Sequence, residues 1–183
     1  KSVYFTTIRC AYDPNDKSVI PARGGNNPIY EGEKLIYTIR FQNTGNDTAS
    51  RVVLRDRLDN HLNWSTFRPL AASHPCETTI DNAGWIEVVF DPIELPDSNT
   101  NVMASQGFFC FEVTPKGGVP VNTVLENSAE IYFDANPPVL TNTVLNTISA
   151  PVVKTNQPGD GRLVRVFPNP FNNLLSMQIP EGT

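Results

Sequence analysis

The sequence predicts an all-β protein, an immunoglobulin-like antiparallel β-sandwich with a short C-terminal β appendage. Two observations carry this prediction. About seven short segments alternate apolar and polar residues at roughly even spacing, and none shows a helical period. The 183 residues also include 16 Pro and 11 Gly, and only 18% of them are charged. Frequent turns between short alternating strands are typical of sandwiches.

The strongest early strand is expected at 33–42, where Leu35, Tyr37, Ile39 and Phe41 share one face. This period of two is typical of a half-buried strand. A short strand, 17–20, precedes it, and a turn at 43–47 follows it. A further strand-like run lies at 3–8.

Later strands are expected at 50–58, 62–67, 85–90, 108–113, 123–133 and 143–148. In the segment 50–58, Val52 and Leu54 face inward, and in the segment 123–133, Ala129 and Ile131 face inward. We therefore expect the core to contain Leu35, Tyr37, Ile39, Val52, Leu54, Ala129 and Ile131.

The expected organisation has four parts. Residues 1–12 form an N-terminal strand or tail, 13–149 the sandwich, and 150–161 a linker rich in Pro, Gly and polar residues. Residues 162–183 hold two short strands, 163–167 and 174–179, which would be marginal in water by themselves. Because the sequence starts at Lys1 without a signal peptide, we expect a mature or excised piece of a larger precursor.

Composition argues against several function classes. The net charge is −5 without a basic cluster, which argues against nucleic-acid binding. No apolar run is long enough to span a bilayer. The only histidines, His61 and His74, lack metal-ligand spacing, and Ser73-His74 alone is no catalytic triad. We therefore expect a protein that is not an enzyme. Its three cysteines permit at most one disulfide or are simply small apolar residues.

Several motifs resemble a known module when taken together. They are DPNDK (13–17), YTIRFQNTGNDTA (37–49), Ser73-His74, LPDSN (95–99), NSAEIYFDANPP (127–138) and TNT (141–143). Across about residues 11–149 they resemble a β-sandwich module of secreted and surface proteins of Bacteroidetes, related to the conserved-repeat domain of bacterial adhesins. The resemblance implies extracellular or cell-surface residence, and it implies no catalytic activity.

The segment VRVFPNPFNNLLSMQIPEG (164–182) resembles the opening of the C-terminal sorting domain used by the type IX secretion system. It departs from that pattern because the domain's later strands and basic C-terminus are absent. The resemblance implies export across both membranes, with the type IX machinery as a partner during export.

Three polar residues occupy inward positions of the predicted strands. Asn127 takes an inward place in the segment 123–133, Asp56 lies between Leu54 and Leu58, and Lys17 shares a face with Val19. Burial lowers the pKa of an amine and raises that of a carboxylic acid. A neutral lysine could then attack an amide while the acid donates a proton, as in adhesin sandwiches of related type. The prediction is an isopeptide bond between Lys17 and Asn127 assisted by Asp56; the alternative is polar groups that hydrogen-bond backbone.

Two further sites are expected at loops. Asp13, Asn15, Asp16, Asp134 and Asn136 would gather at one pole of the sandwich, and their oxygens suit Ca²⁺; ordinary Asx turns are the alternative. Asp47-Thr48-Ala49 matches the short O-glycosylation signal of exported Bacteroidetes proteins, with Thr48 as the acceptor, or else forms a polar turn.

The function expected from these observations is a non-enzymatic structural or adhesion module of the cell surface. It would associate with itself or with neighbouring domains of its precursor, and the segment 162–183 could add strands to another subunit and build a filament. The alternative is a carbohydrate-binding accessory module of a larger secreted enzyme. Trp64 and Trp85 could line its site, although core packing is the commoner role of such aromatics.

Overall fold

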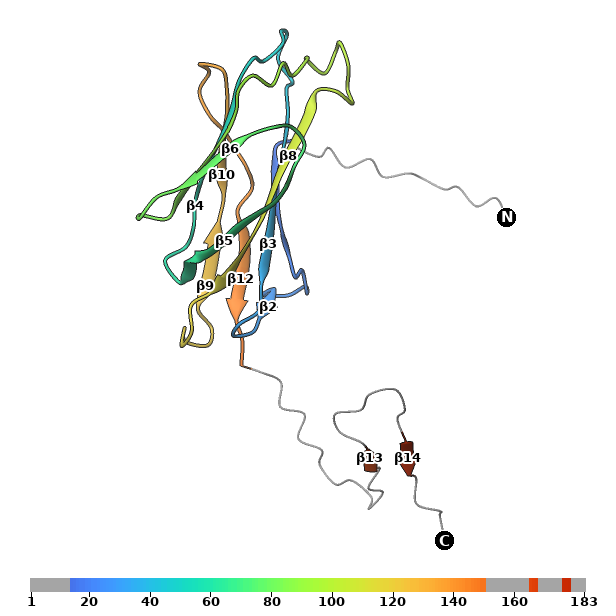
Figure 1. Ribbon diagram of the computed structural model, residues 1–183, viewed down its shortest axis with the longest axis vertical. Coiled ribbons are helices and arrows are strands. Elements are labelled where there is room, and N and C mark those ends of the chain that lie inside the picture. Colours follow the sequence, from blue (N-terminus) through green and yellow to red (C-terminus); the bar gives the residue numbers. More distant parts are fainter. Residues whose placement is uncertain (1–13, 151–164, 168–175, 179–183) are drawn as a thin grey trace, which may run out of the picture. The chain divides into compact units, whose positions relative to one another are not determined.

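A computed structural model describes residues 14–150 and the backbone of two short strands further along the chain. It divides into two compact units, Lys1–Pro151 and Val152–Thr183. The first unit is all-β and holds the site discussed below (Figure 1). Its strands are β1 (Asp16–Ile20), β2 (Pro28–Ile29), β3 (Leu35–Gln42), β4 (Val52–Arg57), β5 (Leu62–Ala72), β6 (Glu77–Ile80), β7 (Trp85–Phe90), β8 (Gln106–Pro115), β9 (Val124–Asn127), β10 (Ala129–Phe133), β11 (Val139–Leu140) and β12 (Val144–Ile148).

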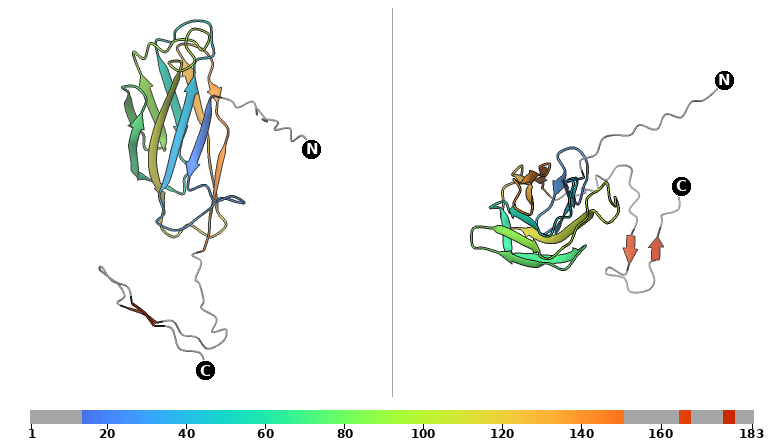
Figure 2. Two further views of the ribbon diagram at one scale, coloured as in Figure 1. Left: turned by 90° about the vertical axis from the view of Figure 1, so that its right-hand side faces the viewer. Right: turned by 90° about the horizontal axis from the view of Figure 1, so that it is seen from above.

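Three sheets surround one interior, as the end-on view in Figure 2 shows. The first has the strand order β1-β3-β8-β5 and the second the order β11-β10-β4-β7-β6, with antiparallel pairs throughout. The third has the order β2-β12-β9, in which only β2 and β12 are parallel. The predicted all-β sandwich is therefore confirmed.

The interior follows the alternation of the sequence. Every core residue predicted from the pattern is buried, and β3 alternates strictly between buried and half-buried positions. Aromatic side chains fill the centre, where the rings of Tyr37 and Phe111 stack with centroids 5.3 Å apart. Such pairs add to the stability gained by burying their area.

The strand expected at 123–133 is wrong as a single element. It breaks at Ser128 into β9, which pairs with β12, and β10, which pairs with β4. Leu125, Asn127, Ala129 and Ile131 are all buried, so the alternation continues across the break. The chain changes sheets without changing its inward face, and for that reason the sequence pattern did not reveal the break.

Other elements also differ from expectation, among them the two-residue strands β2 and β11, which were not expected. The strand β5 extends to Ala72 with irregular pairing to β8, and its Pro69 is tolerated because β5 is an edge strand. The strand β6, Glu77–Ile80, was not expected at all. It pairs with β7 and forms one edge of the second sheet. The sequence of an edge strand alternates less regularly between apolar and polar residues, because neighbouring elements cover only part of each of its faces.

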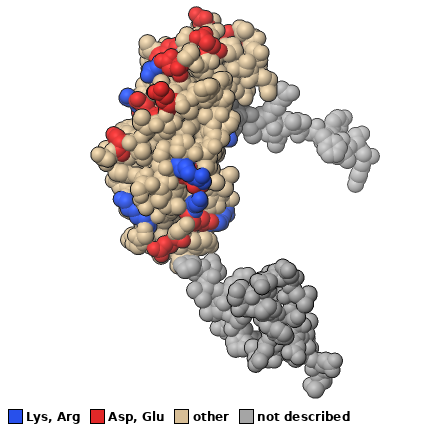
Figure 3. All heavy atoms as spheres, in the orientation of Figure 1, with Lys and Arg blue, Asp and Glu red and all other residues tan. Residues whose placement is uncertain are grey.

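In the second unit, β13 (Arg165–Phe167) and β14 (Ser176–Gln178) pair antiparallel. The expected strand at 3–8 lies outside the described residues. Among the residues that the structure describes, no helix is long and apolar enough to cross a membrane. The face of the first unit shown in Figure 3 carries small groups of both charges separated by uncharged surface.

Candidate functional site

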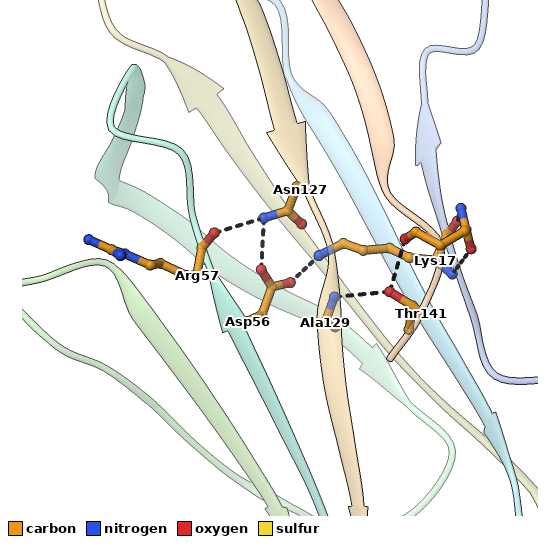
Figure 4. A network of polar contacts seen from close by, with 7 residues as sticks. Lys17, Asp56, Arg57, Asn127, Ala129 and Thr141 are labelled. Carbon is orange, nitrogen blue, oxygen red and sulfur yellow. Dashed lines mark hydrogen bonds and ion pairs between the residues drawn. The ribbon is translucent and has the colours of Figure 1, made fainter. Parts of the chain in front are cut away.

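Three polar side chains meet inside the sandwich, and each comes from a different sheet (Figure 4). Lys17 lies on β1, Asp56 on β4, and Asn127 is the last residue of β9. They are 2%, 1% and 3% exposed, respectively. The structure thus brings together the three residues that the sequence pattern selected, at the place where the three sheets meet.

The Lys17 amine forms an ion pair with Oδ2 of Asp56 and has no contact with bulk water. Burial lowers the pKa of the amine, and the Asp56 charge and hydrogen bond only partly offset this effect. The amine also lies 5.0 Å from the ring centre of Tyr37 and 5.6 Å from that of Phe111. Burial, followed by the Asp56 charge, raises the pKa of Tyr37, which keeps its phenol neutral. The amine is therefore buried against one carboxylate and two aromatic rings.

The Asn127 carboxamide meets the other oxygen of the same carboxylate. Its Nδ2 donates to Asp56 Oδ1 at 2.8 Å and to the carbonyl of Arg57 at 3.1 Å. Its Oδ1 is buried and has no hydrogen-bond partner within the described part of the chain. An amine and an amide thus contact the two oxygens of one acid, and the amide carbonyl is unpaired.

A second set of bonds fixes the backbone around this site. The Asn142 side chain accepts from Lys17 N–H at 2.9 Å and donates to Lys17 C=O at 3.0 Å. The neighbouring Thr141 hydroxyl accepts from Ala129 N–H at 2.9 Å and donates to the Asn142 carbonyl at 3.0 Å. Sequence reasoning gave these two residues no role, although they lie in the TNT motif at 141–143.

Three residues of the expected calcium site, Asn15, Asp16 and Asp134, have protein partners for their side chains. Asp16 bonds to the Arg40 guanidinium at 2.7 and 2.5 Å, and Asn15 accepts from Gln42 N–H. Asp134 Oδ1 accepts from the backbone amides of Ser50 and Arg51, just before β4. Asn136 donates its backbone N–H to Phe133, and Asp13 lies outside the described residues.

Within residues 14–150, no three His, Cys, Asp or Glu side chains gather as a metal site would require. The calcium site stays a prediction.

The remaining expected residues lie apart from this site. Thr48 is exposed in the loop before β4, where a modifying enzyme could reach it, and its glycosylation stays a prediction. Ser73 Oγ lies 2.9 Å from His74 Nδ1, but it also accepts from Phe108 N–H and so joins the end of β5 to β8. Cys76 and Cys110 are free thiols.

A comparison with protein families matches residues 13–147 to a family described as a domain of unknown function, DUF7619. This match extends from before β1 into β12, the last strand of the sandwich. None of the curated proteins compared with the chain matches it.

Solved structures show the same fold at low identity. A variant of BcpA, the major pilin subunit of Bacillus cereus, is 15% identical with a TM-score of 0.53, over 73% of this chain and 39% of the pilin. The major pilin SpaD of Corynebacterium diphtheriae is 20% identical with a TM-score of 0.51, over 72% of this chain and 34% of the pilin. The chain thus spans little more than a third of these proteins. At this identity, the likeness shows the fold alone.

Proposed function

This chain belongs to the DUF7619 family of domains of unknown function, and we propose that it is a non-enzymatic structural module locked by one isopeptide bond between Lys17 and Asn127. The observation that carries the proposal is the buried meeting of Lys17, Asp56 and Asn127. A buried ion pair is by itself weak support for stability, because the desolvation of both charges opposes their attraction. A role in forming a covalent bond explains why such a pair lies in an apolar interior.

The proposed reaction starts with a proton transfer from Lys17 to Asp56, which leaves a neutral amine and a carboxylic acid. The amine nitrogen attacks Cγ of Asn127, so that a Nζ–Cγ bond forms and the Cγ–Nδ2 bond breaks. Asp56 gives its proton to the departing Nδ2 and takes one from Nζ. The products are a secondary amide, the neutral acid and ammonia, so that atoms and charge balance without an oxidant or a cofactor.

The surroundings favour each step of this reaction. The lowered pKa of Lys17 makes the neutral amine accessible. Asp56 already contacts Nδ2, the atom that must leave with an added proton. The carbonyl oxygen Oδ1 has no hydrogen-bond partner among the described residues, so it can accept a hydrogen bond as negative charge develops on it during the attack.

Intact mass spectrometry tests the bond directly. The folded protein should be lighter than its sequence by one ammonia. Because trypsin does not cleave after a modified lysine, a digest should contain residues 10–23 joined to residues 117–154. The isosteric Asp56→Asn variant should restore the full mass, as should Asp56→Ala if it folds, while Asp91→Asn, at an exposed side chain, serves as a matched surface control. A wild-type protein of unmodified mass rules the bond out.

The location we propose is extracellular or on the cell surface, after export by the type IX secretion machinery. The sequence resemblance to Bacteroidetes surface modules supports this location, and so does a fold shared with pilin subunits. Fractionation of a cell that carries the intact gene tests it. Protein found in the cytoplasm, also when the secretion system is functional, would contradict the proposal.

Self-association through the segment 162–183 is part of the same proposal. Two short strands are marginal alone, and pairing with the edge of another sheet would stabilise them. Head-to-tail contacts of this kind do not close and so produce filaments. Electron microscopy should show filaments of the full chain and none after deletion of 162–183. A full chain that stays monomeric at high concentration would refute the assembly.

A second candidate function is carbohydrate binding on the outer face of the second sheet. Trp85 is 39% exposed there. It lines two hollows of about 410 and 220 Å³, and Arg55 and Glu130 also line both of them. An exposed indole suits the apolar face of a sugar ring, and charged groups beside it can bond hydroxyls. Affinity electrophoresis through soluble β-glucan, xylan or mannan tests this function. Retardation that Trp85→Ala abolishes would support it, and equal migration in every gel would exclude these ligands.

A further inference from the structure

The backbone of Lys17 is held from the side of β1 to which no strand within residues 14–150 is hydrogen-bonded. Among the described strands, β1 pairs with β3 alone, and Lys17 is opposite Ile39 in that pair. The N–H and C=O of Lys17 both bond to Asn142, so both point away from β3. In an antiparallel pair, alternate residues expose their backbone groups in this way. The Asn142 carboxamide provides one acceptor and one donor, and it replaces the missing strand at this single residue.

Asn142 is itself tied to the strand that follows Asn127. Thr141 bonds to both backbone groups of Ala129, with its own N–H donating to the carbonyl and its hydroxyl accepting from the amide. The same hydroxyl donates to the Asn142 carbonyl. Ala129 is only two residues beyond Asn127 in the chain. Thr141 and Asn142 therefore connect the backbone of the attacking lysine to the backbone of the amide that it attacks. Figure 4 shows Thr141 beside Ala129.

We infer that Asn142, supported by Thr141, is a positioning residue for the bond between Lys17 and Asn127. This inference rests on the proposed function. A slip of β1 by one residue would turn Lys17 outward and place a neighbour in the interior. A strand of five residues with one partner resists such a slip poorly. Asn142 opposes this slip at Lys17, the residue of β1 whose side chain reacts. Reaction rates fall steeply when the reacting groups are misplaced by about 1 Å.

The test separates folding from bond formation. The full chain is isolated unfolded, before the bond forms, and refolded by dilution. Tryptophan fluorescence reports folding, and samples quenched in acid report the loss of ammonia by intact mass. In Asn142→Ala, we expect bond formation to slow about tenfold, while folding keeps its rate, because two hydrogen bonds of the productive geometry are lost. Asn142→Asp keeps the acceptor for Lys17 N–H, so its rate of bond formation should lie between those of the wild-type chain and Asn142→Ala.

Thr143→Ala is the matched control, because it changes an exposed neighbour of Asn142. It should react at the wild-type rate. A pH profile supplies a second readout: in Asn142→Ala the rate should fall by the same factor at every pH. A merely structural role that admitted water to the site would instead move the profile, because hydration restores the ordinary pKa of a lysine.

The outcomes distinguish this inference from the proposed function. A wild-type chain that never loses ammonia overturns both. A wild-type chain that reacts, with an Asn142→Ala chain that reacts as fast, overturns the inference alone. So does an Asn142→Ala chain whose folding slows as much as its bond formation. If Asn142→Ala does not fold, the same comparison is made with Thr141→Val, which removes only the hydroxyl bonds to Ala129 and Asn142.

Discussion

At the scale of single residues, the sandwich contains a charged pair where an aliphatic pair would be expected. Lys17 and Asp56 are buried among aromatic side chains, and the desolvation of a lysine is the larger influence on its pKa. Removing one partner of such a pair typically costs about 3–5 kcal/mol, because the other charge is left alone in the interior. Both Asp56→Ala and Asp56→Asn remove the charge, but Asp56→Asn keeps the shape of the side chain and one oxygen that can accept from the Lys17 amine, so it is the better probe of the chemistry.

The lowered pKa of Lys17 predicts how stability depends on pH when the bond is absent. In an Asn127→Ala chain, folded Lys17 loses its proton at a lower pH than unfolded Lys17, whose pKa is near 10.5. Between these two values the unfolded state binds more protons, so the free energy of unfolding should rise with pH. Urea denaturation at several alkaline pH values measures this. The double variant Lys17→Met, Asn127→Ala should lack the rise.

The window for that measurement ends near the ordinary tyrosine pKa of about 10. Burial raises the pKa of Tyr37, so above this limit the folded state holds a proton that the unfolded state loses. Stability should then fall with pH, in the opposite direction from the Lys17 effect. A flat profile in the Asn127→Ala chain below this limit would contradict the lowered pKa.

A calcium ion at the expected loops would be seen as stabilisation. Any ligand that binds only the native state raises the melting temperature by mass action. We predict that a chelator lowers the melting temperature and that Asp134→Asn removes this response. Asparagine keeps the oxygen that accepts from the amides of Ser50 and Arg51, so the variant alone should have a small effect on stability. No shift with either chelator or added calcium would count decisively against the site.

At the scale of elements, the close approach of β3 and β8 depends on one glycine. Gly107 is opposite Phe41 in the pair, and a Cβ atom there would lie 2.3 Å from the Phe41 ring. The ring is buried against Phe90 and has little room to move, with centroids 5.3 Å apart. The absence of a side chain at residue 107 is thus required by packing.

We predict that Gly107→Ala lowers the free energy of unfolding by about 1–3 kcal/mol through overpacking. Gly117→Ala is the matched control, since its Cβ would lie 3.6 Å from the nearest atom, an oxygen of the Glu31 side chain. The control should change stability by less than about 0.5 kcal/mol. Chemical denaturation of both variants measures the difference, and equal effects would show that Phe41 yields to the added methyl group.

At the scale of the whole sandwich, the proposed bond would join the first strand to the ninth. Force applied to residues 14 and 150 would then pass through Lys17 and Asn127, and residues 18–126 would carry none of it. Only residues 128–150 and the short start of β1 could extend. By the loss of chain entropy in the unfolded state, closing a loop of this length would also stabilise the fold by about 4–5 kcal/mol.

Single-molecule pulling between residues 14 and 150 gives a clear prediction. The 23 residues of 128–150 can add at most about 80 Å of length in the wild-type chain. An Asp56→Asn chain without the bond can extend over all 137 residues, to about 480 Å. A long extension of the wild-type chain would show that no bond bypasses the body of the sandwich.

The fold class, the inward faces of the main strands and the identity of the three buried polar residues all follow from the amino-acid sequence. Local physics suffices for these features, because a period of two assigns each residue to a face of its strand, whatever the strand's neighbours are. Polar residues at apolar positions of that pattern, such as Asp56 and Asn127, therefore stand out in the sequence alone.

Which strands are neighbours is a property of the tertiary structure. The chain changes sheets at Ser128, Lys17 reaches Asp56 across 39 residues of sequence, and Asn142 holds the backbone of Lys17 across 125 residues. Alternation is the same on both sides of a sheet change, and a side-chain amide that replaces a strand leaves no periodic signal. Contacts of this kind depend on how the three sheets pack against one another, and no local pattern in the chain encodes that packing.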